Sequence, residues 1–136
     1  METLVIVVSA EGWNLDVVAD SLKSSHRVSL TDRCLEVSQA TSSAYVCVVD
    51  PDEELIFEEW PEELIPRTSF TAFSVDYRDP ALAESIVRLI SANAPAVVDT
   101  NFGEVVSGSE FVARVDLGDP VWEWWHWRGD PDGSSR

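Results

Sequence analysis

The side chains of this sequence best suited to chemistry are carboxylates gathered in one stretch, which we call the acidic segment (residues 50–63). Closely spaced carboxylates can hold a cation, exchange protons as an acid–base pair, or attract a positively charged surface. The segment contains no Lys or Arg that would neutralise it. Its carboxylates belong to Asp50, Asp52, Glu53, Glu54, Glu58, Glu59, Glu62 and Glu63.

The whole chain carries a formal net charge of −16, so the acidic segment belongs to a molecule of the same sign. Concentrated like charges destabilise a compact state by self-repulsion, and the field that they create attracts cationic partners. The same field repels a phosphate backbone or an anionic lipid surface, and the few basic residues form no stripe that would bind one. We therefore expect a basic protein as partner, and neither nucleic acid nor a membrane.

The acidic segment does not match a calcium-binding loop. An EF-hand loop that began at Asp50 would need glycine at its sixth position and glutamate at its twelfth. These positions hold Leu55 and Pro61. The sequence also lacks the glycine-rich motifs that cradle phosphates and the Gly-x-Ser-x-Gly motif of hydrolases. We predict no metal and no cofactor.

Two weaker arrangements keep a small enzyme open as an alternative. One is a zinc site built from His26, His126 and a cysteine, although the spacing of these residues is not typical of zinc ligands. The other is a carboxylate pair on adjacent strands, such as Asp76 with Asp99 or Glu104, acting as general acid and base. Such pairs are common on any acidic surface, so we predict that the protein is not an enzyme.

Aromatic and aliphatic residues accompany the acids, and four of the six tryptophans lie near the C-terminal end. If Trp122–Trp127 were a strand, alternate indoles would face opposite sides, and one pair would remain exposed. Exposed tryptophans often anchor protein interfaces, whereas the alternatives are an aromatic lid over the core and a homodimer seam. We predict that the partner-binding residues are the eight carboxylates with Trp60, Trp124, Trp125 and Trp127. We also expect the acidic segment and the residues just after it to be attached to the body of the protein by apolar side chains, namely Leu55, Ile56, Phe57, Trp60, Leu64 and Ile65.

Hydrophobic periodicity predicts an α+β fold. Amphipathic helices are expected near residues 15–23, capped by Asn14, and 80–93, capped by Asp79; Ser109 is expected to cap a brief third helix. The order of elements predicts a two-layer sandwich with a mainly antiparallel sheet, two main helices and a ferredoxin-like centre. We expect one domain over residues 1–128 and a frayed tail over 129–136. Strands are expected over residues 4–8, 26–30, 35–40, 45–49, 70–77, 96–99 and 104–106, with a hairpin turn at 100–103.

The two cysteines, Cys34 and Cys47, are not arranged as in a small secreted domain stabilised by disulfides. Cys47 lies in the apolar run AYVCVV, where we expect a buried small hydrophobe. The N-terminus is not typical of a signal peptide, because Glu2 stands where a cationic region belongs. No stretch approaches the length of a membrane span. These observations predict a cytoplasmic protein.

Residues 74–115 read SVDYRDPALAESIVRLISANAPAVVDTNFGEVVSGSEFVARV. They combine a strand, a helix that begins with Asp-Pro, a short Val-Val-Asp strand, an Asn-x-Gly turn and a closing Ser-Glu-Phe segment. In these features the chain resembles the small bacterial immunity proteins that accompany secreted polymorphic toxins. The resemblance implies a cytoplasmic inhibitor that neutralises one cognate toxin, often a nuclease. Immunity proteins differ widely in fold, so the resemblance assigns no binding residue.

Charge and resemblance lead to the same first hypothesis, a non-enzymatic immunity protein or inhibitor of a basic toxin domain. A nuclease is basic where it holds phosphate, so an acidic partner can occupy that groove and gain association rate from electrostatic steering. The first alternative is a DNA mimic that regulates a DNA-binding protein, which needs carboxylates spaced along a rod. The second is a small enzyme that uses carboxylates and His126.

Overall fold

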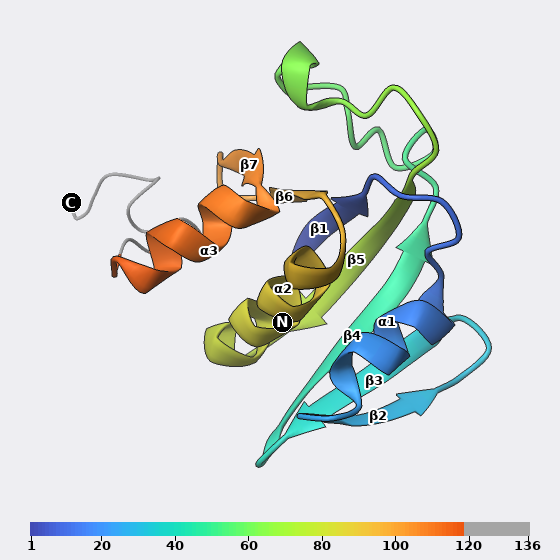
Figure 1. Cartoon of the computed structure of the whole chain (residues 1–136), viewed down its shortest axis with the longest axis vertical. Coiled ribbons are helices and arrows are strands. Elements are labelled where there is room, and N and C mark those ends of the chain that lie inside the picture. The colour runs from blue at the N-terminus through green and yellow to red at the C-terminus, as the bar shows by residue number, and fades with distance from the viewer. Residues whose placement is uncertain (119–136) are drawn as a thin grey trace.

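The structure, a computed structural model, describes residues 1–118 of the chain. Within these residues, seven strands form one open antiparallel sheet in the order β2-β3-β4-β5-β1-β6-β7, and three α-helices lie on one of its faces (Figure 1). This arrangement confirms the predicted α+β class. In chain order the elements are β1 (Glu2–Val8), α1 (Leu15–Leu22), β2 (Arg27–Leu30), β3 (Cys34–Gln39), β4 (Ser42–Val49), the 3-10 helix η1 (Glu62–Leu64), β5 (Thr71–Tyr77), α2 (Pro80–Asn93), β6 (Ala96–Asp99), β7 (Val105–Ser107) and α3 (Gly108–Asp116).

The four central strands are connected as in a ferredoxin-like fold. Helix α1 lies between β1 and β4 in the chain, α2 lies between β5 and β6, and the four strands interleave in the order β4-β5-β1-β6. The β2–β3 hairpin extends this centre on one side, and β7 extends it on the other. In residues 1–118, no helix is both long and apolar enough to cross a membrane.

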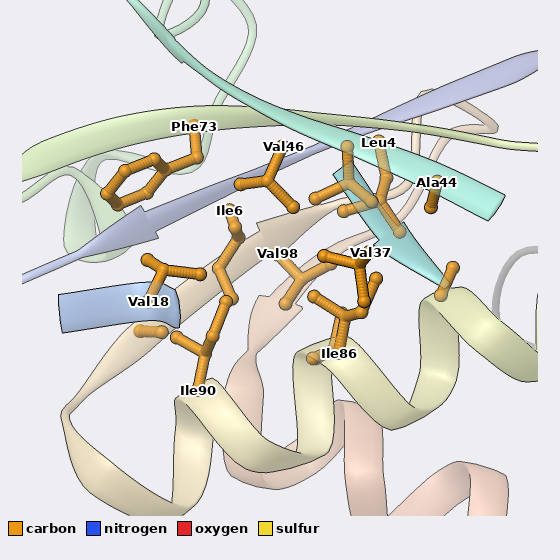
Figure 2. Close-up of a cluster of buried hydrophobic side chains, with 14 of the residues drawn as sticks. Leu4, Ile6, Val18, Val37, Ala44, Val46, Phe73, Ile86, Ile90 and Val98 are labelled. Carbon is orange, nitrogen blue, oxygen red and sulfur yellow. The ribbon is translucent and has the colours of Figure 1, made fainter. Parts of the chain in front are cut away.

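The main core lies between the sheet and the helices. Alternate residues of β1, namely Leu4, Ile6 and Val8, are fully buried against this side. Figure 2 shows Ile86 and Ile90 of α2 directed towards Ile6 and the neighbouring strand residues, with α1 contributing Val18. The alternate apolar residues of β1 and the apolar stripe of α2 therefore pack against each other on one face of the sheet.

Each of the three α-helices begins at a residue whose side chain satisfies a free backbone N–H group. The side chain of Asn14 accepts a hydrogen bond from Val17 N at 3.0 Å, and that of Asp79 accepts from Ala81 N at 3.0 Å. Both predicted caps are confirmed. The predicted cap of α3 is wrong by two residues: Ser107, not Ser109, accepts from Glu110 N, at 3.1 Å. Ser107 has the extended backbone that a capping residue adopts, while Ser109 already lies within the helix.

Strand β4 is only partly buried. Tyr45 is exposed because it lies on the face of the sheet away from the helices, and Val48 is exposed although it alternates in step with the buried Ala44 and Val46. Cys47 lies opposite Cys34 of β3 and forms a disulfide with it. The expectation of Cys47 as a buried small hydrophobe is therefore wrong, because the residue is only partly buried and is disulfide-bonded.

Gly108 of α3 lies directly against Ser91 of α2. A Cβ atom on residue 108 would collide with the Ser91 hydroxyl group and would lie 3.5 Å from the carbonyl oxygen of Ala96. Ser91 Oγ is itself buried and has no hydrogen-bond partner among the described residues. Small side chains at both positions are thus required for this contact.

We expect Gly108→Ala to lower the free energy of unfolding by about 1–3 kcal/mol, because an overpacked contact forces neighbouring groups to move. Adding Ser91→Ala removes the hydroxyl group that the new methyl group meets, so the double variant should recover much of this loss. Urea unfolding of both single variants and of the double variant measures the coupling. Simple additivity of the two effects would contradict the proposed collision.

Tyr77 is 3% exposed at the end of β5. Burial, with a smaller contribution from the nearby Glu2 carboxylate, raises the pKa of its phenol to about 12. In the unfolded chain a tyrosine ionises near pH ~10. Between these values the unfolded state releases a proton that the folded state retains, so stability is complete below pH ~10 and falls as the pH rises.

We expect the free energy of unfolding to fall by about 1 kcal/mol between pH ~9 and pH ~11 through this group. Urea unfolding at the two pH values should show a smaller decrease for Tyr77→Phe than for the unmodified protein. Tyr45→Phe, on an exposed position of β4, serves as the control and should retain the full decrease. An equal decrease in all three proteins would contradict the assignment to Tyr77.

Candidate binding surface

The acidic segment lies in the connection between β4 and β5. In Figure 1 this connection runs from teal to green and extends beyond the ends of the two strands. Turns follow its first carboxylate, where Asp50 accepts hydrogen bonds from the backbone N–H groups of Asp52 and Glu53 at 2.9 and 3.4 Å. The segment is therefore a folded connection with local hydrogen bonds of its own.

A second apolar cluster fixes this connection to the face of the sheet opposite the helices. Val5 and Val7 of β1 and Ala72 of β5 form its base, and Trp60 packs on them. This confirms the expected attachment through apolar side chains, with the exception of Leu55. The partly buried members of the cluster are Val49, Ile56, Phe57, Leu64, Ile65, Phe70, Val97 and Val105.

Trp60 is the central side chain of this attachment. Its indole is 7% exposed, and its Nε1–H donates a hydrogen bond of 2.8 Å to Oδ2 of Asp99. The ring also packs edge-on against Phe57, with 4.9 Å between the ring centroids. The indole is buried between the segment and the sheet, so only a small part of it is left at the surface for the expected contact with a partner.

All the predicted binding carboxylates of the acidic segment are exposed. Glu62 lies 3.9 Å from Arg67, a pair in which both side chains are largely exposed. Exposed pairs at such distances contribute little and are weakened by salt. The segment therefore presents its negative charge to solvent while its apolar residues face the sheet. The exposed carboxylates are those of Asp50, Asp52, Glu53, Glu54, Glu58, Glu59, Glu62 and Glu63.

Two adjoining hollows separate part of the segment from the sheet, and we call them together the acidic groove. Their volumes are about 390 and 250 Å³. Both are lined by Leu55 and Ile56 from the segment and by Asp99 and Asn101 from the end of β6 and the turn after it. The remaining lining residues are Glu58, Glu59, Trp60, Gly103 and Val105 in the larger hollow and Thr3, Val5, Val49, Glu54 and Ser74 in the smaller.

Hydrogen bonds fix the wall of the groove that the sheet provides. Oδ1 of Asp99 accepts from the backbone N–H of Asn101 at 2.9 Å, while Oδ2 accepts from Trp60. The Asn101 side-chain NH₂ donates to the carbonyl oxygen of Thr3 at 2.6 Å. Asn101 has a φ of +66°, a conformation that asparagine tolerates better than most residues. The wall is thus held independently of any ligand.

Leu55 is an exposed apolar residue at the lip of this groove. Its side chain is 64% exposed, and its backbone has a φ of +54°. A branched residue in this left-handed region is uncommon and costs conformational energy. The sequence pattern placed Leu55 among the attaching residues, but the turn directs it to the surface between Glu54 and Ile56.

The acids considered for catalysis lie apart from one another or interact with other residues. Asp76 lies opposite Thr3 and Asp99 opposite Val5 on the two sides of β1, so these acids are not on adjacent strands. Asp76 accepts a 2.6 Å hydrogen bond from the Thr3 hydroxyl group. Glu104, the other acid considered as a partner, lies 3.1 Å from Arg114.

His26 is buried between α1 and α2, where its ring nitrogens lie 2.8 Å from Ser25 Oγ and 2.9 Å from Ser85 Oγ. The two cysteines are joined in the disulfide, so neither offers a thiolate to a metal in this structure. In residues 1–118, no three His, Cys, Asp or Glu side chains are grouped as metal ligands. The predicted contacts through Trp124, Trp125 and Trp127, with Trp122 and His126, lie outside the described residues.

In comparisons with known proteins, no family model, no curated protein and no solved structure matches the chain.

Proposed function

We propose that this protein is a non-enzymatic inhibitor that binds a basic protein domain through its acidic segment, in the manner of an immunity protein that neutralises a nuclease-like toxin. The observation that carries the proposal is that apolar and acidic side chains of residues 50–65 face in different directions. The apolar side chains other than Leu55 attach this connection to the sheet, and all eight carboxylates of the acidic segment face solvent. A charged surface held in place in this way loses little conformational entropy when it binds.

The negative surface favours a cationic partner through its effect on association. Carboxylates displayed together steer a basic surface into encounter, and they raise the association rate more than the final affinity. The basic partner would be met in the cytoplasm, where an immunity protein protects the cell that makes the toxin. The disulfide is a feature more usual in oxidising compartments, so the redox state of Cys34 and Cys47 inside the producing cell is worth measuring.

A DNA mimic is less well supported by this geometry. Mimicry of a duplex needs negative charges repeated along an axis, whereas residues 51–59 form successive turns. The turns cluster the carboxylates beside one end of the sheet. We therefore favour a protein inhibitor over a regulator of DNA-binding proteins.

The test begins with the producing organism. Deletion of this gene should be toxic only while the gene for a basic secreted toxin is present next to it, and purified protein should inhibit that toxin at a one-to-one ratio. Stopped-flow mixing should then show an association rate that falls at least about tenfold between 0.05 and 0.5 M salt. An association rate that is independent of salt would contradict steering by the acidic segment.

A further inference from the structure

We propose that the acidic groove receives an arginine side chain from the basic partner. This inference rests on the proposed function and assigns to it a particular site and a particular ligand group. It starts from the groove between Leu55–Ile56 and Asp99–Asn101, not from the exposed carboxylates alone. With volumes of about 390 and 250 Å³, its two hollows are large enough for a side chain to enter.

The charges around the groove select a cation. Glu58 and Glu59 line the larger hollow, Glu54 lines the smaller, and Asp99 lines both. Among the described residues, neither hollow is lined by Lys or Arg. A cation that enters therefore meets carboxylates from the segment on one side and from β6 on the other.

The apolar part of the lining favours guanidinium over ammonium. Trp60, Ile56 and Val105 contribute to the larger hollow, so a cation that enters loses part of its water shell. Guanidinium is more weakly hydrated than ammonium, stacks on aromatic rings and offers a planar fork of N–H groups to carboxylates. The NH₂ group of Asn101 is already used by Thr3, and this leaves its side-chain oxygen as a further acceptor.

Leu55 supplies the apolar contact that such a binding site needs beside its charges. It is held at the lip of both hollows in a left-handed backbone conformation. Interfaces combine an apolar or aromatic anchor with a polar rim, and a charged rim without an anchor gives little affinity. The methylene groups of an arginine in the groove would extend beside Leu55.

The test uses the full chain alone and three small probes: the N-acetyl amides of arginine, lysine and citrulline. Citrulline has nearly the shape of arginine but no charge. In two-dimensional ¹⁵N NMR, we expect saturable shifts from the arginine probe at the backbone amides of Leu55, Asn101 and Gly103 and at the indole N–H of Trp60. The apparent affinity should exceed that for citrulline by about tenfold, since hydrogen bonds to charged groups are the stronger ones.

Two variants locate the effect. Glu58→Gln with Glu59→Gln should weaken binding of the arginine probe, while Glu11→Gln, an exposed residue outside the groove and the acidic segment, should leave it unchanged. Equal shifts from arginine and citrulline, equal affinities for arginine and lysine, or shifts spread over all acidic parts of the surface would each overturn the inference. Because no partner is used, failure here leaves the salt-dependent inhibition of a toxin to be judged separately.

Discussion

Trp60→Ala should lower the free energy of unfolding by about 3–5 kcal/mol, as expected for truncation of a buried aromatic side chain. The indole joins Val5 and Val7 of the sheet to the acidic segment, and its N–H group is the hydrogen-bond partner of Asp99. Removing it leaves a cavity in the second apolar cluster and detaches a connection that carries eight mutually repelling carboxylates. Urea unfolding followed by circular dichroism measures the loss.

Two variants define the cause of this effect. Trp60→Phe retains much of the ring but not the N–H group, so we expect a loss of about 1–2 kcal/mol. Leu55→Ala removes an exposed side chain from the same segment and should change stability by less than about 0.5 kcal/mol. Of these variants, only Trp60→Ala should be cleaved faster than the unmodified protein within residues 50–65 in limited proteolysis. An unchanged unfolding midpoint together with unchanged proteolysis would contradict the attaching role of Trp60.

Replacing both cysteines by serine should cost up to about 3 kcal/mol, the value expected from the entropy that a disulfide removes from the unfolded chain over a loop of this length. Cys34 and Cys47 are separated by 13 residues in the sequence. The loss should appear in urea unfolding under oxidising conditions and should be reproduced by adding reductant to the unmodified protein.

A neighbouring pair on the same two strands provides the control for the disulfide. Ser38 and Ser43 lie opposite each other in β3 and β4, and their hydroxyl groups are 3.0 Å apart. Replacing both by alanine should cost only about 1 kcal/mol. If reductant leaves the unfolding midpoint of the unmodified protein where it was, the disulfide contributes no stability and the prediction is wrong.

Much of the fold could be predicted because local signals agreed with the final packing. The Asp79-Pro80 pair starts α2 where expected, and Asn14 caps α1, since both signals act within one helical turn. The apolar run of β1 indicated a strand buried on both faces. The structure confirms this, with Ile6 covered by the helices and Val7 covered by the connection between β4 and β5.

The features that sequence reasoning missed depend on contacts between distant residues. The attachment of Trp60 to the body was expected, but the acceptor of its N–H group, Asp99, lies far away in the sequence and no local pattern indicates it. The acidic groove likewise exists only where the segment lies over the ends of several strands. The disulfide did have a signal: Cys34 and Cys47 are equidistant from the turn at Ala40–Thr41, and register across a tight hairpin pairs such positions.

The central claim is that the location of the acidic segment, and not merely the net charge of the molecule, governs binding. The most direct test compares two variants with the same change in net charge. One is Glu58→Gln with Glu59→Gln in the acidic segment, and the other is Glu11→Gln with Asp32→Asn, two exposed residues elsewhere. The measurement is the association rate with the cognate basic toxin in stopped-flow mixing at low salt. We predict that the first variant associates several-fold more slowly while the second stays close to the unmodified protein; equal rates for the two variants would contradict the claim.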